Sequence, residues 1–330
     1  MTTRKRILTG DRPTGKLHLG HYVGSLQNRV RLQDEYDTFV FVADVQALTT
    51  HFERTDRLAA DVRQVALDNI AAGLDPEKTT YFIQSMIPEI AELTAFYSMF
   101  VTVNTLRHNP TIKAESQQYG YADLSYGFLG YPISQTADIT FCKADLVPVG
   151  EDQLPHMELT RKIVRRFNDL YKPVLPEPQA LLSDCPRLVG LDGKAKMGKS
   201  LGNGIYLSDP SAVVAEKVNA ALTDPARVRA SDKGTPSVCT VNTYHSVFNA
   251  TEQPDLAERC KNGSIGCVAC KKRLCASLED LLAPMRERRA HFTAKPGQID
   301  EILQSGTAKA RLIAQETMRE IRDAMQISYF

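Results

Sequence analysis

Apolar and polar positions alternate with two different periods along the first ninety residues of this 330-residue chain. Strands are predicted at residues 6–9, 38–43 and 79–84, where β-branched and aromatic side chains gather. Helices are predicted at 19–35 and 58–72, the second with one apolar face at helical spacing and Gly73 directly after it. Strands and helices in this order predict β-α-β units and therefore a parallel sheet.

The pattern continues with a strand at 146–150, a helix at 151–170 and the end of the sheet near Leu182. Residues 183–204 are rich in Pro, Gly and Lys and have little periodicity, which indicates a mobile loop or linker. Helical patterns follow at 211–222, 278–292 and 299–325. We predict a Rossmann-like, doubly wound parallel α/β domain over residues 1–183 and a smaller all-helical domain over 184–305. A C-terminal helix, about 306–330, is expected to pack back onto the first domain.

Composition narrows the class of protein only slightly. The chain is 43% hydrophobic and 24% charged, and it has no apolar run long enough to cross a bilayer. Its basic start is followed by a short strand instead of an apolar signal core, so a cytoplasmic location is expected. The net charge of +1 requires any RNA binding to come from a local basic patch.

The first candidate chemistry lies directly after the first predicted strand. Residues 10–17 resemble a Walker A phosphate loop, but Leu17 stands where a hydroxyl must reach Mg²⁺, which disfavours a P-loop NTPase. His18-Leu19-Gly20-His21 follows at a strand-to-helix junction, where backbone N–H groups favour anions. The two imidazoles could donate hydrogen bonds to phosphate, and Gly20 would let ATP approach the backbone. Taken alone, so short a motif is equally compatible with a surface helix.

A second motif, Lys196-Met197-Gly198-Lys199-Ser200, lies in the predicted linker. Lysines on such a loop could close over a pyrophosphate leaving group and neutralise it, although most lysine-rich loops are simply solvated. The two motifs together resemble the two signatures of class I aminoacyl-tRNA synthetases. Gly198 replaces the serine usual in that family, while both lysines are kept.

Further segments resemble tryptophanyl-tRNA synthetases in particular, namely residues 9–15, 136–139, 148–153, 158–161 and 318–322. The resemblance covers the full chain, with tyrosyl-tRNA synthetases as the nearest sibling family. It implies a tryptophan–tRNA ligase that activates L-tryptophan with ATP and Mg²⁺ to tryptophanyl-adenylate, transfers it to the 3′ end of tRNA(Trp) and forms a homodimer. A catalytically silent homologue that binds RNA or protein, and another nucleotidyl transferase, are the alternatives.

The choice of amino acid has a physical basis. An indole offers one N–H donor and no acceptor, so a selective pocket needs one buried acceptor. Asp138, among Ala137, Ile139 and Phe141, is the candidate, and the alternative is a carboxylate on a helix surface. The resemblance implies that Asp138 receives the indole N–H and that Gln153 and Tyr131 lie near the amino-acid end.

For catalysis, the resemblance implies that His18, His21, Lys196 and Lys199 act on the phosphates. It places the ATP site at Arg12, Pro13, Thr14, Gly20 and His21 on one side, Gly150, Glu151 and Asp152 at the ribose, Leu188 and Val189 at the adenine, and Lys196, Met197, Gly198, Lys199 and Ser200 in the lysine loop. Lys113 matches a phosphate-contacting position of the family, although a lone lysine is more often solvated.

Seven cysteines without an export signal argue against a disulfide framework. Four of them have the spacing C-x₂₀-C-x₆-C-x₂-C, which is typical of a metal or cluster site; they are Cys239, Cys260, Cys267 and Cys270. The residues alone do not separate Zn²⁺ from an iron–sulfur cluster. The resemblance favours [4Fe-4S], because some tryptophanyl-tRNA synthetases have such a segment with a first interval two residues longer. Ordinary buried thiols are the alternative, and Cys142 and Cys185 are interpreted in that way.

A basic patch surrounds the last three of these cysteines. It consists of Arg259, Lys261, Lys271, Lys272 and Arg273, with no acidic residue between Glu258 and Glu279. The corresponding domain of the family meets the tRNA anticodon. We therefore expect the cluster to order a basic loop that reads unpaired anticodon bases.

Overall fold

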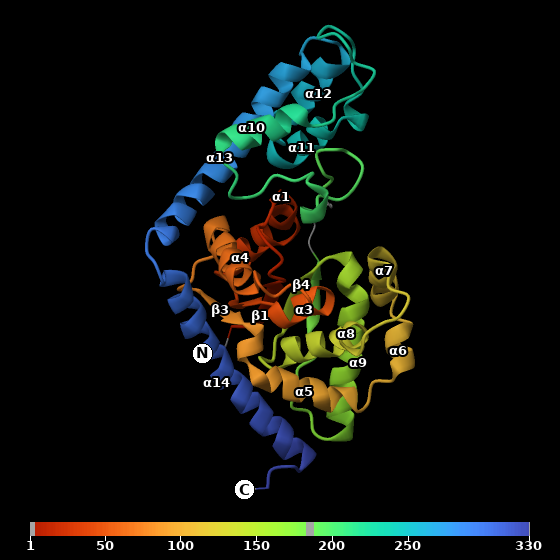
Figure 1. Ribbon diagram of the computed structural model, residues 1–330, viewed down its shortest axis with the longest axis vertical. Coiled ribbons are helices and arrows are strands. Elements are labelled where there is room, and N and C mark those ends of the chain that lie inside the picture. Colours follow the sequence, from red (N-terminus) through yellow and green to blue (C-terminus); the bar gives the residue numbers. More distant parts are fainter. Residues whose placement is uncertain (1–3, 183–187, 330) are drawn as a thin grey trace.

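The computed structural model describes residues 4–182 and 188–329 (Figure 1). Within them, one parallel sheet has the strand order β3-β2-β1-β4-β5. Its strands are β1 (Arg6–Asp11), β2 (Asp37–Val42), β3 (Thr79–Ile83), β4 (Leu146–Val149) and β5 (Gln179–Leu182). Because the order reverses direction between β1 and β4, the sheet is doubly wound, and the predicted fold class is confirmed.

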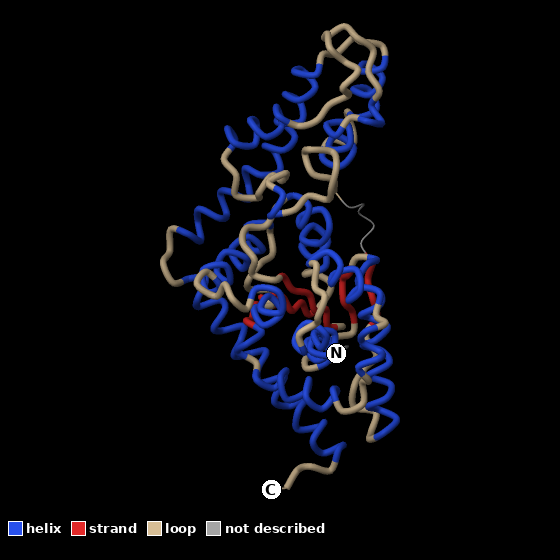
Figure 2. The backbone as a smooth tube through the Cα atoms, turned by 45° about the vertical axis from the view of Figure 1, so that its right-hand side comes forward, coloured by secondary structure: helices blue, strands red, loops and turns tan. Residues whose placement is uncertain are grey.

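Alternate residues of the strands enter two separate apolar cores, one on each face of the sheet. Phe39 of β2 packs with Leu8 and Phe82 in one core, while the next residue, Val40, packs in the other. All four side chains are buried, which explains why these strands read as continuous apolar runs in the sequence. Helices therefore have to cover both faces, as Figure 2 shows.

The helices of the first part follow the predicted order with one interruption. They are α1 (Leu19–His21), α2 (Gln27–Leu32), α3 (Asp44–His51), α4 (Leu58–Ala72), α5 (Pro88–Ser98), α6 (Val103–Arg107), α7 (Pro110–Tyr119), α8 (Tyr126–Thr140) and α9 (Leu154–Leu170). The single helix predicted at 19–35 is divided by a π-helical turn, η1 (Tyr22–Leu26). Gly73 ends α4 with φ of 118°, a left-handed conformation that favours glycine.

The second part is helical and extends from the sheet as an elongated lobe (Figure 1). It contains α10 (Ser211–Ala220), α11 (Thr240–Phe248), α12 (Gln253–Lys261) and α13 (Cys267–Thr293). The helix predicted from residue 278 starts already at Cys267, because the basic run at 271–273 hides its apolar period. Towards its C-terminal end, α13 returns to the first part and packs against α4.

The last helix, α14 (Gln298–Met325), lies along the edge strand β3. Thr307 accepts a hydrogen bond from the Ile83 N–H at 3.2 Å, and Lys309 donates one to the Thr80 hydroxyl at 2.8 Å. A Cβ at Gly306 would overlap the Tyr81 carbonyl oxygen, so only glycine permits this approach. Among the described helices, none is long and apolar enough to cross a membrane.

Candidate active site

A cavity of about 430 Å³ opens at the carboxyl ends of β1 and β4. This is the crevice where the strand order reverses, and open α/β sheets bind their ligands at such a point. Eight residues predicted for ATP or tryptophan line it, namely Arg12, Thr14, His21, Tyr131, Asp138, Gly150, Gln153 and Lys199. The structure thus brings parts of both predicted binding sites into one cavity.

Other predicted residues lie outside the cavity wall. They are Pro13, His18, Gly20, Glu151, Asp152, Leu188, Val189, Lys196, Met197 and Gly198. Lys113 is exposed on α7, in keeping with an ordinary solvated lysine. The side chain of Ser200 is outside the described part of the chain.

His18 and His21 stack closely, with ring centroids 3.9 Å apart. The His18 backbone N–H donates to His21 Nδ1 at 3.2 Å, which leaves Nε2 of His21 as the atom that carries hydrogen. Burial, together with the neighbouring positive charges, lowers the pKa of His18 to about 4 and that of His21 to about 3. Both imidazoles are therefore neutral at pH 7, so His21 can donate a hydrogen bond without a positive charge of its own.

Backbone hydrogen bonds hold the turn that carries these histidines. The Leu17 N–H donates to Asp68 Oδ2 at 2.8 Å, and the Leu19 N–H donates to the Ile205 carbonyl at 2.9 Å. A Cβ at Gly20 would stand 3.0 Å from the His18 ring and 3.5 Å from Cβ of Met197. Tight packing around His18 is therefore a reason for glycine at this position.

Residues 188–204, part of the segment that we expected to be a mobile loop or linker, form a hairpin; residues 183–187 lie outside the described part. Val189 and Lys196 pair in an antiparallel bridge, and the Gly190 N–H donates to the Ala195 carbonyl at 2.8 Å. Met197 is only 2% exposed and packs in an apolar core. Its structural role is therefore to anchor the hairpin.

The two lysines of the hairpin are placed differently. Lys199 donates from Nζ to the Thr14 hydroxyl at 3.2 Å and to the Gly15 carbonyl at 2.8 Å, which joins the lysine motif to the turn after β1. Burial lowers the pKa of Lys199. Lys196 is exposed and does not line the cavity. In this conformation Lys199 is the lysine that reaches the cavity.

Asp138 lies on α8 at the apolar end of the cavity and is 1% exposed. Gln84 donates from Nε2 to its two oxygens at 2.8 and 2.9 Å, and Gln46 lies 3.5 Å from Oδ2. Burial raises the pKa of Asp138 to about 7, and the nearby Asp44 charge adds to the effect. Phe41, Ile139 and Val147 also line the cavity. Asp138 is thus a buried acceptor beside apolar side chains, which suits a flat ligand with an N–H donor.

Tyr131, on α8, and Gln153, in the turn η3 (Glu151–Gln153), both line the cavity. The Tyr131 hydroxyl donates to Glu115 at 2.9 Å and lies 2.7 Å from Nε2 of His156. Burial, followed by the Glu115 charge, raises the pKa of Tyr131. The hydroxyl is therefore neutral, and it donates its hydrogen to Glu115.

Sequence reasoning missed Gln46, Gln84 and Glu115, which support the predicted residues. Gln84 directly follows β3, and Gln46 follows β2 by four residues. Polar side chains after neighbouring parallel strands meet at one edge of the sheet, and this signal could have found both glutamines. No comparable signal marks Glu115, which comes from the helix α7.

Comparison with known proteins decides the family. A family model described as tRNA synthetases class I (W and Y) matches residues 1–283. The tryptophan–tRNA ligases of Streptococcus pneumoniae and Lactococcus lactis are 48% and 47% identical to the chain, each over 99% of both sequences. The chain belongs to the class I tryptophanyl-tRNA synthetases. It is accordingly an aminoacyl-tRNA synthetase, which excludes the P-loop NTPase and the other nucleotidyl transferases.

Solved tryptophanyl-tRNA synthetases share the fold over nearly the whole length. The Campylobacter jejuni structure, complexed with ADP and tryptophan, matches with a TM-score of 0.86 at 29% identity over 97% of this chain and 99% of that one. The Mycoplasma pneumoniae structure matches with a TM-score of 0.81, also at 29% identity, over 98% of each chain. A tyrosyl-tRNA synthetase from Archaeoglobus fulgidus, 23% identical, shares the fold with a TM-score of 0.68.

The four cysteines predicted to bind a metal lie near the far end of the helical lobe. Cys239 precedes α11, Cys260 is on α12, and Cys267 and Cys270 occupy the first turn of α13. Among the described residues, no three His, Cys, Asp or Glu side chains are grouped closely enough to hold a metal ion. The arrangement of these side chains therefore does not show that the chain belongs to the subgroup with an iron–sulfur cluster.

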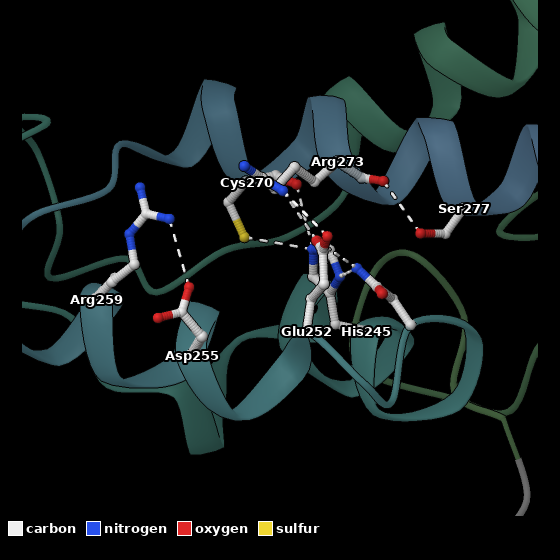
Figure 3. Close-up of polar contacts among 8 residues, drawn as sticks. His245, Glu252, Asp255, Arg259, Cys270, Arg273 and Ser277 are labelled. Atoms are coloured by element: carbon white, nitrogen blue, oxygen red, sulfur yellow. Dashed lines mark hydrogen bonds and ion pairs between the residues drawn. The ribbon is translucent and has the colours of Figure 1, made fainter.

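The four thiols nevertheless affect one another. Burial, followed by the charges of the other three, raises the pKa of Cys270 to about 11. Arg227 donates from Nη1 to Sγ of Cys260 at 3.4 Å. His245 Nε2 lies 3.4 Å from Sγ of Cys270 (Figure 3). Nε2 of His245 also lies 3.2 Å from the Cys270 carbonyl oxygen. An N–H donor to sulfur, such as that of Arg227, is a typical second partner of a metal-bound thiolate. The donor set therefore suits a metal, although its side chains do not stand in a closed ligand shell.

The remaining cysteine predictions and the basic patch have mixed outcomes. Cys142 is fully buried, and burial raises its pKa to about 12, as expected of an inert thiol; Cys185 lies outside the described residues. The basic run 271–273 lies on α13, so it is helical and not the loop that we expected. Lys271 donates to the carbonyls of Asn219 and Ala221. Arg273 pairs with Glu252 (Figure 3).

Proposed function

We propose that the cavity between β1 and β4 activates L-tryptophan with ATP, and that the tryptophanyl group then passes to tRNA(Trp). The observation that carries this proposal is the position of Asp138. It is a buried acceptor at the apolar end of the cavity that also contains His21 and Lys199. Chemical selectivity for an indole and stabilisation of phosphate charge thus come from one cavity.

Tryptophan binding starts from the N–H of the indole ring. In this proposal the ring lies among Phe41, Ile139 and Val147 and donates to Asp138, which Gln84 holds in place. Tyr131 and Gln153 hold the amino-acid end towards the phosphates. A tyrosine side chain would bring a hydroxyl whose oxygen has both a donor and acceptor sites, so one of its groups would remain unpaired beside Asp138.

Adenylate formation needs position and charge, and no covalent protein intermediate. The tryptophan carboxylate oxygen attacks the α-phosphorus of ATP, and the bond to the bridging oxygen breaks as pyrophosphate leaves with that electron pair. His21 donates from Nε2 and Lys199 from Nζ to phosphate oxygens, beside Arg12 and Thr14. Mg²⁺ enters with ATP and neutralises part of the phosphate charge.

The other predicted ATP contacts keep their roles as proposals. Gly150 is on the cavity wall, and Glu151 and Asp152 follow it towards the ribose. His18 supports the ring of His21 from a distance of 3.9 Å. Contacts from Leu188, Val189 and Lys196 to the nucleotide require the hairpin to move towards the cavity. In the second step a terminal ribose hydroxyl of tRNA attacks the carbonyl carbon, and AMP leaves.

ATP–pyrophosphate exchange measured separately with each of the twenty amino acids tests the activity. We expect exchange with tryptophan and at most a trace with tyrosine or phenylalanine, because a site built for hydrogen bonding rejects analogues by about 10⁴-fold or more. A catalytically silent homologue would show exchange with none of them. Exchange with tyrosine in preference to tryptophan would contradict the role of Asp138.

We also propose that Cys239, Cys260, Cys267 and Cys270 hold a [4Fe-4S] cluster, with Zn²⁺ as the alternative. Four free cysteines on or directly before three neighbouring helices of the lobe support it. Arg227, which donates to Sγ of Cys260, and His245, whose Nε2 lies 3.4 Å from Sγ of Cys270, support it as well. The metal group would tie α11, α12 and α13 together. These helices belong to the part, residues 184–305, that we propose binds the anticodon of tRNA.

Metal content after anaerobic purification tests the cysteine proposal. We expect iron with sulfide, or zinc, in the intact protein and its loss in the double variant Cys267→Ser/Cys270→Ser. Cys275→Ser is the matched control, because Cys275 is a free thiol on the same helix and outside the motif. If the intact protein contains neither metal, or the double variant retains it, the proposal is wrong.

A further inference from the structure

Asp68, on α4, is a completely buried carboxylate outside the cavity. Its Oδ2 accepts the Leu17 N–H at 2.8 Å, next to His18 in the sequence. Its Oδ1 accepts from Gln64 at 2.9 Å and from Nη1 of Arg289. One buried side chain therefore connects Arg289 to the turn at residues 17–21 that carries His18 and His21, which we call the histidine turn.

Arg289 comes from α13, the helix that begins at Cys267 in the helical lobe. Its second nitrogen, Nη2, donates to Oε1 of Gln64 at 2.9 Å, so Gln64 and Asp68 receive the two arms of one guanidinium group. From Cys267 to Arg289, α13 rises by about 33 Å between the cysteine segment and this contact. Two hydrogen bonds, from Arg289 to Asp68 and from the Leu17 N–H to Asp68, thus link α13 to the backbone of the histidine turn.

The histidine turn has its other backbone ties to the same side of the molecule. The Leu19 N–H donates to the Ile205 carbonyl, and the Leu207 N–H donates to the Leu17 carbonyl at 3.0 Å. Residues 205–207 lead into α10, and Lys217 of α10 donates to the Gly204 carbonyl at 2.9 Å. Residues 205–207 therefore hold the turn through backbone hydrogen bonds, and Asp68 of α4 holds it through a side-chain acceptor.

We propose that Asp68 and Arg289 are positioning residues for adenylate formation, and that through them the placement of α13 sets how well the turn with His18 and His21 meets ATP. This inference rests on the proposed activity of the cavity. A buried carboxylate keeps its orientation only while its partners are in place, so loss of Arg289 frees Asp68 and with it the Leu17 N–H. Asp68 also acts on Lys199, since its charge opposes the lowering of the lysine pKa by burial.

Steady-state kinetics of Arg289→Gln tests this inference. The expected result is a loss of about 10- to 100-fold in kcat/KM for ATP per active site, because a displacement of about 1 Å has that effect on a positioned group. The KM for tryptophan should stay unchanged, since the side-chain hydrogen bonds of Asp68 and Arg289 within the described part of the chain go to Leu17, Gln64 and each other, and none goes to Asp138. Rates are normalised by active-site titration, so that unfolded protein does not count as lost catalysis.

Arg288→Gln is the matched control. Arg288 neighbours Arg289 and also bridges to α4, through the Ala71 carbonyl at 2.8 Å, but it does not reach Asp68. The double variant Asp68→Asn/Arg289→Gln removes the unpaired charge and keeps an oxygen for the Leu17 N–H, so it should regain part of the lost kcat/KM and remain folded.

The outcomes separate this inference from the proposed activity. If the unmodified protein shows no tryptophan-dependent exchange, the activity itself is wrong. If the unmodified protein is active and Arg289→Gln keeps its kcat/KM for ATP, the positioning role is wrong. The role is also wrong if KM for tryptophan changes as much as that for ATP, or if Arg288→Gln shows the same loss.

Discussion

At Asp138, burial and hydrogen bonding act in opposite directions on one carboxyl group. Burial raises its pKa to about 7, whereas the bonds from Gln84 and Gln46 lower it. The group therefore changes charge close to neutral pH, where an ordinary aspartate is fully ionised. Since an ionised carboxylate accepts a hydrogen bond more strongly than a protonated one, binding of an indole should depend on this ionisation.

The pH dependence of the tryptophan KM follows from this ionisation. As pH rises through about 7, Asp138 loses its proton and KM should fall, by about tenfold between pH 6 and 8 if only the ionised form binds. Exchange kinetics across this pH range measure the effect, and Asp138→Asn, which does not titrate, is the control. An equal slope in both proteins would show that another group is responsible.

At the scale of elements, the lysine hairpin, residues 188–204, shows that two similar residues of one sequence motif can be placed differently in the structure. Lys196 and Lys199 are equivalent in the sequence, but only Lys199 reaches the turn at Thr14. The fold around the hairpin makes this difference, because Met197 between them is buried in the core. Such a difference depends on contacts distant in sequence, so the motif could not predict it.

Alanine variants of the two lysines should therefore differ. Lys199→Ala is expected to lower kcat for exchange by about 10²- to 10³-fold, the effect of removing one donor that stabilises transition-state charge. Lys196→Ala should cost less, because its side chain starts from an exposed position. Measured kcat values of both variants check this order; a larger loss for Lys196→Ala would mean that the hairpin rearranges before the reaction.

The contact between α14 and β3 gives a prediction about stability. Gly306→Ala should destabilise the protein by about 1–3 kcal/mol, because its Cβ overlaps the Tyr81 carbonyl oxygen and the helix must move away. Gly24→Ala is the control: an added Cβ there meets nothing within 4 Å. Thermal unfolding should show a lower Tm for Gly306→Ala alone, and equal Tm values for both variants would contradict the packing.

For the whole molecule, the sequence predicted the sheet well because its signals are local. The apolar runs at 38–43 and 79–84 are buried on both faces, and Gly73 ends the helix between them. The cavity was predicted in outline, since Asp138, His21 and Lys199 do converge. Its supporting glutamines and the Asp68–Arg289 pair were not, because those contacts join residues up to 221 positions apart.

An exposed apolar groove bears on the homodimer, which we expected from the family and propose here. It has a volume of about 670 Å³ between α3, α5 and α8, and it is bordered by Phe52 and Tyr126, which are 64% and 81% exposed. Gln46 and Tyr131 line both this groove and the cavity between β1 and β4. Surfaces of this kind are usually covered by a partner, and a second copy would cover the groove beside each cavity.

Light scattering on the purified protein tests the dimer. The expected mass is twice 36.7 kDa, and Tyr126→Glu, which places a charge in the groove, should shift the protein towards the monomer. Tyr329→Glu changes a similarly exposed tyrosine away from the groove and serves as the control. A monomer in all three samples would contradict the proposal.

The recognition of the indole N–H by Asp138 is the claim on which the whole account depends. The most direct measurement compares tryptophan with its analogue in which sulfur replaces the indole nitrogen, using kcat/KM in ATP–pyrophosphate exchange. We expect the analogue to be poorer by about 10⁴-fold in the unmodified protein, because it leaves the buried Asp138 unpaired. In Asp138→Ala this preference should largely disappear. Equal use of both amino acids by the unmodified protein would contradict the account.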